Sequence, residues 1–275
     1  MKGLNKIALV TAIAAAPFAA HADLKAMDDS AMGNITGQAG VTIELETQVS
    51  IGTFTYTDEG SFNVHGIEIG GSGLAGGTGT NLLDDLKIDI DVASDGDAVI
   101  HVGSISGNPI DWGMTADSMT LTAHADDAAQ DSTTLISNLS GHGNLAQLDI
   151  RVDTATDHLQ LDVAFNVVDM DFDVEFLGVG IRDLAIYGGQ FFEQGPGGGL
   201  PALFAVADVE VYKGDGLGDS PQEDVLRIDV NDITMDMSIG AIEIGTLADG
   251  SAASIGSIAM DNLTISNTTL AVYGH

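Results

Sequence analysis

The sequence has no cysteine, and it has only 8 lysine and arginine residues against 41 aspartate and glutamate residues. Without cysteine there is no disulfide and no thiol for lipid attachment, so packing and hydrogen bonds must hold the fold. A formal net charge of −33 at pH 7 repels nucleic acid and anionic lipid headgroups, because binding to phosphate needs clustered cations. We therefore expect no nucleic-acid partner. The 44% hydrophobic content excludes a fully disordered polymer.

Aromatic residues are scarce, at 5% of the chain, with Trp112 as the single tryptophan. Asp169 and Asp171 share one strand face, as a glycosidase pair would, but glycoside-binding clefts usually offer aromatic platforms. No Gly-x-Ser-x-Gly elbow, His-Glu-x-x-His pair or Gly-Lys phosphate loop occurs. We therefore predict that the protein is not an enzyme. Five histidines have no zinc-site spacing and are interpreted as surface or hydrogen-bonded strand residues: His65, His101, His124, His142 and His158.

The N-terminal segment 1–22 has the features of an export signal. Lys2 and Lys6 precede an apolar stretch at 7–20, and Ala20-His21-Ala22 has the small-x-small form that signal peptidase cuts. No later apolar run approaches the ~20 residues that a membrane helix needs, so we expect no transmembrane span in the mature chain. The predicted location is the cell surface or the extracellular space, with the periplasm as the alternative.

A short leader, 23–40, follows the predicted cleavage point. Leu24, Met27, Ala31 and Ile35 recur at spacings of three and four residues, which is typical of an amphipathic helix. We predict a short helix here; an unstructured leader is the alternative, because Gly33 weakens a helix.

From Val41 onwards the apolar period changes to two, which predicts strands. In the stretch 169–176, for example, apolar and acidic residues alternate, so that one face of the strand is apolar and the other is acidic. Residues 41–275 are therefore predicted to be one acidic, glycine-rich, all-β domain. We favour a large antiparallel meander, as a curved sheet or a two-sheet sandwich, with a β-solenoid as the alternative. The glycine-rich stretches 70–80 and 190–201 are predicted loops.

A six-residue element recurs four times, at 83–88, 181–186, 230–235 and 260–265. Each copy places two polar residues between apolar ones, so the alternation slips by one position. Such a slip predicts a β-bulge, which lets a long strand bend without exposing its apolar face.

Calcium is the metal that the composition favours, because many aspartates lie beside glycine and hard cations need clustered oxygens from loops. The predicted site is the acidic loop that contains Asp215, Asp219, Glu223 and Asp224. A second acidic loop contains Asp95 and Asp97. In the alternative interpretation, these are turn residues that hydrogen-bond their own backbone.

The acidic strand faces raise an electrostatic problem, because like charges directly opposite one another destabilise a strand pair. Two solutions are open. The aspartates face serine, threonine and asparagine on neighbouring strands, or salt and divalent cations screen them.

The stretch 36–41, Thr-Gly-Gln-Ala-Gly-Val, follows the pair Asp28-Asp29. Through the Asp-Asp pair and this stretch, the segment 24–43 resembles the N-terminal region of an uncharacterised family of exported Gram-negative proteins. Some members of that family are labelled as pilus-system components. The resemblance implies a surface or pilus-associated role and supplies no catalytic residues.

Together these features predict an exported, non-enzymatic structural protein that assembles with itself or with other envelope or pilus proteins, through sheet edges or sheet faces. The alternative is a monomeric, calcium-stabilised β module that binds carbohydrate or a surface. An enzyme acting on polysaccharide is the least favoured.

Overall fold

The computed structural model describes residues 40–123, 131–246 and 252–274. The predicted signal peptide lies outside the described residues, and so does the leader up to residue 39. His124 also lies outside them. Residues from Gly40 onwards form one unit.

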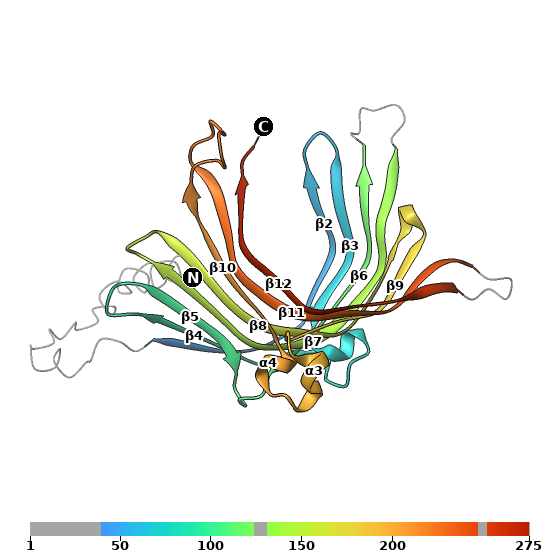
Figure 1. Ribbon diagram of the computed structural model, residues 1–275, viewed down its shortest axis with the longest axis horizontal. Helices are drawn as coiled ribbons and strands as arrows, with labels where there is room; N and C mark the ends of the chain where they lie inside the picture. Colours follow the sequence, from blue (N-terminus) through green and yellow to red (C-terminus); the bar gives the residue numbers. More distant parts are fainter. Residues whose placement is uncertain (1–39, 124–130, 247–251, 275) are drawn as a thin grey trace, which may run out of the picture. The chain divides into compact units, whose positions relative to one another are not determined.

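The described residues form one antiparallel sheet of twelve strands (Figure 1). The strands are β1 (Val41–Thr47), β2 (Val49–Thr57), β3 (Ser61–Gly70), β4 (Leu83–Val92), β5 (Ala98–Ser104), β6 (Ile110–Thr122), β7 (Ser132–Asp153), β8 (His158–Val174), β9 (Val179–Tyr187), β10 (Ala205–Gly214), β11 (Val225–Thr246) and β12 (Ala252–Val272). The short helical elements are the 3-10 helices η2 (Ser72–Ala75), η3 (Glu175–Leu177) and η4 (Gly195–Gly197) and the α-helical turns α3 (Phe191–Gln194) and α4 (Leu200–Leu203).

The longest strands each pair with different neighbours along their length. β8 pairs with β10 near its start and with β9 near its end, and β11 pairs with the same two strands in the same order. The sheet therefore has two halves. The first half has the order β1-β4-β5-β7-β8-β10-β11-β12, and the second has the order β2-β3-β6-β7-β8-β9-β11-β12.

The chain thus crosses the sheet eight times, as β1 with β2, β3 with β4, β5 with β6, β7, β8, β9 with β10, β11 and β12. Each crossing pairs antiparallel with the next one along the sequence. The predicted antiparallel meander is confirmed, in its curved-sheet form, and Figure 1 shows the long strands bending along their length. The β-solenoid alternative is wrong, because the rungs of such a solenoid pair in parallel.

The predicted bulges are also confirmed. Asp85, Asp183 and Asn262 hold the same place in three copies of the six-residue element, and all three have left-handed backbones, with φ of 61°, 52° and 53°. In the remaining copy, 230–235, the register with β10 skips Asn231. Aspartate and asparagine tolerate this conformation better than other non-glycine residues, which explains why the polar pair recurs at these bends.

Alternation gives the first half of the sheet one apolar face. One row of directly opposed residues crosses all eight strands, and it consists of Ile43, Ile88, Val102, Leu148, Val163, Ala207, Ile233 and Ile265. Residues one position away along each strand point to the other face, which is polar.

The segment between β9 and β10 carries α3, η4 and α4 across one face of the sheet (Figure 1). Asp236 on β11 is wholly buried, and its carboxylate accepts hydrogen bonds from the backbone N–H of Phe192 at 2.8 Å and of Asn262 at 2.7 Å. Asn166 on β8 donates to the carbonyl of Leu203 at 3.2 Å. Buried polar groups on the sheet therefore hold a segment that was predicted only as a glycine-rich loop.

Candidate functional site

The polar face of the first half carries a row of opposed acids, which we call the acidic ladder. It runs from strand to strand across the sheet. Its members are Asp89, Asp149, Asp162, Asp208 and Asp232, with His101 between Asp89 and Asp149, Thr42 at one end and Ser266 at the other.

Most carboxylates of the acidic ladder have a polar partner. Asp89 accepts from the Thr42 hydroxyl at 2.6 Å and pairs with Lys87 at 3.0 Å, and the hydrogen bond from Thr42 is the main reason why its pKa is lowered. Asp149 contacts His101, and Asp208 accepts from Asn231 at 3.0 Å. Among the described residues, no donor reaches the carboxylate of Asp162. Burial, followed by the charges of Asp208 and Asp149, raises the pKa of Asp162.

In the second half of the sheet, hydroxyl groups and an arginine, rather than further carboxylates, lie near the acids of the polar row. There the corresponding polar row contains Thr53, His65, Ser118, Ser137, Asp173, Gly180, Glu243 and Ser254. Arg182 pairs with Asp173 at 2.5 Å and with Glu243 at 3.0 Å. The expectation that aspartates face hydroxyl groups is therefore confirmed for Asp173 and wrong for the middle of the acidic ladder, where aspartates face one another.

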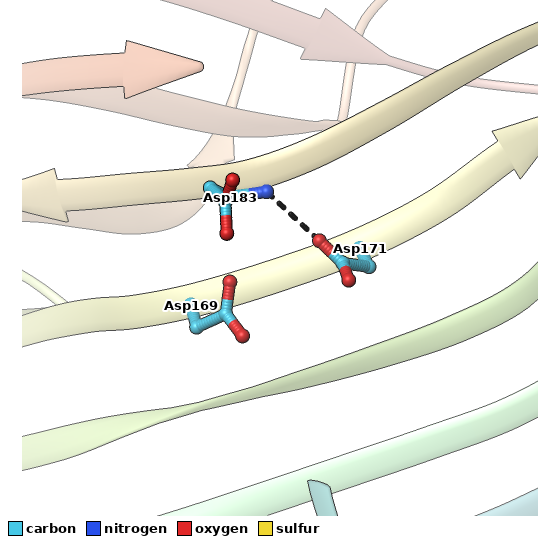
Figure 2. A group of neighbouring side chains, drawn as sticks. All are labelled: Asp169, Asp171 and Asp183. Carbon is cyan, nitrogen blue, oxygen red and sulfur yellow. Dashed lines mark hydrogen bonds between the residues drawn. The ribbon is translucent and has the colours of Figure 1, made fainter. Parts of the chain in front are cut away.

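Three carboxylates meet where β8 and β9 bend (Figure 2). Asp169 and Asp171 lie on β8 and Asp183 lies on β9, and one oxygen from each falls within 4.8 Å of the other two. The backbone N–H of Asp183 donates to Asp171 at 2.8 Å. Gly240 on β11 leaves room for Asp183, because a Cβ at that position would lie 2.7 Å from the Asp183 side chain.

Two atoms near these acids lack partners. Oδ1 of Asp169 and Nδ1 of His142 are buried, and neither has a hydrogen bond among the described residues. Burial, followed by the charges of Asp171 and Asp183, raises the pKa of Asp169, and His142 opposes the shift. Three oxygens at this spacing suit a hard cation such as Ca²⁺, although a complete calcium shell needs six to eight oxygens.

The calcium site predicted from the sequence lies in the turn between β10 and β11. Asp224 pairs with Lys213 at 2.9 Å, and the carbonyl of Asp215 accepts from Arg227 at 2.8 Å. Within the described ranges, Asp215, Asp219, Glu223 and Asp224 do not form a group with closely spaced ligand oxygens; Asp169, Asp171 and Asp183 do. The alternation of the sequence indicates that Asp169 and Asp171 share a face, but nothing in it predicts that Asp183 joins them.

The second acidic loop has a structural role. Asp97 is 3% exposed, and its Oδ1 accepts from the N–H and the hydroxyl of Thr154, each at 2.9 Å. Its Oδ2 accepts from Nε of Arg151 at 2.7 Å, and Arg151 also reaches Asp95 at 3.1 Å. These bonds join the β4–β5 turn to the β7–β8 turn. Hydrogen bonds from Thr154 and Arg151 lower the pKa of Asp97.

A cavity of about 890 Å³ lies between the α3–α4 segment and the polar face of the first half. His101, Gln147, Gln190 and Glu193 supply hydrogen-bonding groups, and Phe204 supplies apolar surface. No lysine or arginine is among the described residues that line the cavity, so an anionic ligand would find no counter-charge there.

The sheet has two long edges, one formed by β1 followed by β2 and the other by β12. In the described part of the chain, β1 pairs only with β4, β2 only with β3, and β12 only with β11. Large apolar side chains on these edges are exposed: Val41 by 56%, Phe54 by 53% and Ile255 by 66%. Unpaired backbone groups beside exposed apolar side chains are a template for pairing with another strand. The helical elements among the described residues are all far too short to cross a membrane.

Comparison with known proteins gives one match. No curated protein and no solved structure matches the chain. Residues 1–94 match the model of a family of unknown function, DUF6160, which is consistent with the resemblance to an uncharacterised family and covers the N-terminal part of the chain through β4.

Proposed function

We propose that the protein is an exported, non-enzymatic structural protein of a Gram-negative cell surface. It belongs to a pilus-like or adhesive assembly and associates through its sheet. The observation that carries this proposal is the pair of long edges, each with exposed apolar side chains.

The composition of these edges supports assembly. Soluble β proteins block their edges with lysine, proline or very short strands. β1, β2 and β12 contain no lysine, arginine or proline, and β12 is 21 residues long. The acidic face disfavours association, because its negative charge repels the same face of another copy.

The test places one charge on an edge. Ile258 on β12 is 42% exposed, and Leu217 in the β10–β11 turn is 43% exposed, so Ile258→Lys and Leu217→Lys add the same charge at similarly exposed apolar positions. We expect the full-length chain and Leu217→Lys to form large species in sedimentation velocity and electron microscopy, and Ile258→Lys to lose them. A full-length chain that stays monomeric at all concentrations, and is recovered from the periplasm rather than from sheared surface material, would refute the proposal.

A second candidate function is the calcium-stabilised binding module. Two observations favour it, namely the oxygens shared by Asp169, Asp171 and Asp183 and the cavity beside α3 and α4. A periplasmic monomer whose stability depends on calcium would support it over the structural role.

A further inference from the structure

The two edges of the sheet run in opposite directions. The meander has eight crossings, so the first, β1 followed by β2, runs from the first half to the second, and the last, β12, runs back. If a second copy is placed beside β12 in the same orientation, its β1 and β2 lie antiparallel to β12. Joining the last crossing to the first of the next copy therefore continues the antiparallel pattern found throughout the sheet.

The cross-strand rows give the register of such a joint. In the first half, the acidic ladder begins at Thr42 and ends at Ser266, and the apolar row begins at Ile43 and ends at Ile265. A neighbouring copy that extends both rows without a shift places its Thr42 opposite Ser266 and its Ile43 opposite Ile265. Apolar then meets apolar and hydroxyl meets hydroxyl, as sheet pairing requires.

The second half gives an independent register. Its polar row begins at Thr53 and ends at Ser254. The stretch of chain from Thr42 to Thr53 is shorter than the stretch from Ser254 to Ser266 by a single position. The two halves thus agree on one joint almost completely. The bulge at Asn262 places one extra residue on β12, which accommodates the difference.

Charge favours this joint over a symmetric one. The first edge carries Glu44 and Glu46, and β12 carries Asp261. In the register above, Glu44 faces Thr264 and Glu46 faces the bulge formed by Asp261 and Asn262, so only Glu46 comes near another carboxylate. A two-fold antiparallel pairing of β1 with itself places Glu44 and Glu46 near their own copies, where like charges repel.

We propose that β12 of one copy pairs with β1 and β2 of the next, with Thr42 opposite Ser266 and Thr53 opposite Ser254. This inference rests on the proposed structural function and specifies its contact. The joint is head to tail and leaves a free edge at each end, so it generates an open filament. The acidic ladder and the apolar rows are then continuous along the filament.

Cysteine cross-linking tests the joint directly, because the chain has no cysteine of its own. Full-length Thr42→Cys and Ser266→Cys are mixed and oxidised, since directly opposed residues lie within disulfide distance. We expect a covalent dimer in the mixture and none from either variant alone. Thr53→Cys with Ser254→Cys should give the same product. Thr42→Cys with Ser254→Cys is the matched control, which combines positions from opposite halves of the sheet and should give none.

The outcomes separate this inference from the proposed function. If large species form and neither matched pair cross-links, the joint is wrong and assembly through the sheet stands. If each variant cross-links only with itself, the contact is two-fold, which also overturns the joint. If no large species and no cross-links form, both the joint and the proposed function are wrong.

Discussion

Asp162 on β8 lies directly opposite Asp208 on β10, and β11 places Asp232 opposite Asp208 in turn. Three neighbouring strands therefore present carboxylates to one another on the same face. Burial raises the pKa of Asp162 first, and the charges of Asp208 and Asp149 raise it further. The folded sheet thus contains a local repulsion that the unfolded chain lacks.

Replacing Asp162 by asparagine is expected to stabilise the protein at neutral pH. Like charges across two strands cost a few tenths of a kcal/mol, so a gain of about 0.5 kcal/mol is expected after allowance for solvent exposure. The pKa of Asp162 is higher in the folded state than in the unfolded state, so its ionisation lowers stability as pH rises through the folded pKa. The gain from Asp162→Asn should therefore shrink as the pH falls through that pKa. Thermal unfolding at pH 7 and in mild acid measures it.

Asp58→Asn is the control for this experiment. It removes one negative charge from the exposed β2–β3 turn, away from the acidic ladder. Equal effects of the two substitutions would mean that net charge, and not the opposed aspartates, sets the stability.

Alternation and slippage in the sequence were enough to predict the strands, the meander and the bulges, because each depends on residues close together in the chain. Pairing across the sheet depends on the register between distant strands. Local patterns therefore contain no indication that Asp149, Asp162, Asp208 and Asp232 form one row. The role of Asp97 was equally hidden, since its partners lie more than 50 positions away along the chain, Arg151 at the end of β7 and Thr154 just after it.

Asp183 shows both what the local sequence pattern predicts and what it does not. The slip at 181–186 predicted a bulge, but the direction of the Asp183 side chain depends on its left-handed backbone and on the space left by Gly240. Those two conditions bring it to Asp169 and Asp171, and neither can be derived from the spacing of the acids.

Asp97→Asn is expected to lower the melting temperature at neutral pH, because it weakens the bonds to Arg151 and Thr154 that join two turns. The pKa of Asp97 is lowered in the folded state, so its contribution is present above the unfolded pKa and is lost as the pH falls through the folded pKa. The variant should therefore show a weaker acid dependence of unfolding than the wild type. Asp95→Asn, which weakens the longer contact with Arg151 and keeps an oxygen for the N–H of Asp97, should have a smaller effect, and the reverse order would contradict this assignment.

Asp236→Ala is expected to destabilise the protein by about 2–4 kcal/mol, because it removes the buried carboxylate that accepts hydrogen bonds from the N–H groups of Phe192 and Asn262. Local loosening should appear first between residues 188 and 204, as faster amide exchange and proteolysis. The exposed neighbour Asp261→Ala serves as the control and should change stability little. Unchanged exchange in the 188–204 segment of Asp236→Ala would show that Asp236 does not hold it.

Calcium is expected to raise the melting temperature more than sodium does at equal ionic strength. Sodium screens the acidic ladder as a whole, whereas a divalent cation can also be held by several carboxylates at once. Two sets of acids compete for this role. The sequence predicts the loop of Asp215, Asp219, Glu223 and Asp224, and the structure brings together Asp169, Asp171 and Asp183 instead.

Two double variants distinguish these sets by calorimetry in millimolar calcium. Asp169→Asn with Asp171→Asn should abolish the calcium-specific shift, because it removes two of the three converging carboxylates. It should also raise the melting temperature without calcium, because burial and the neighbouring acids raise the pKa of Asp169 and its ionised form is unfavourable at neutral pH. Asp215→Asn with Asp219→Asn should leave the shift intact. The opposite pattern would place the calcium site in the β10–β11 turn. Equal shifts of the wild-type melting temperature in calcium and in sodium would mean that charge screening alone explains the effect.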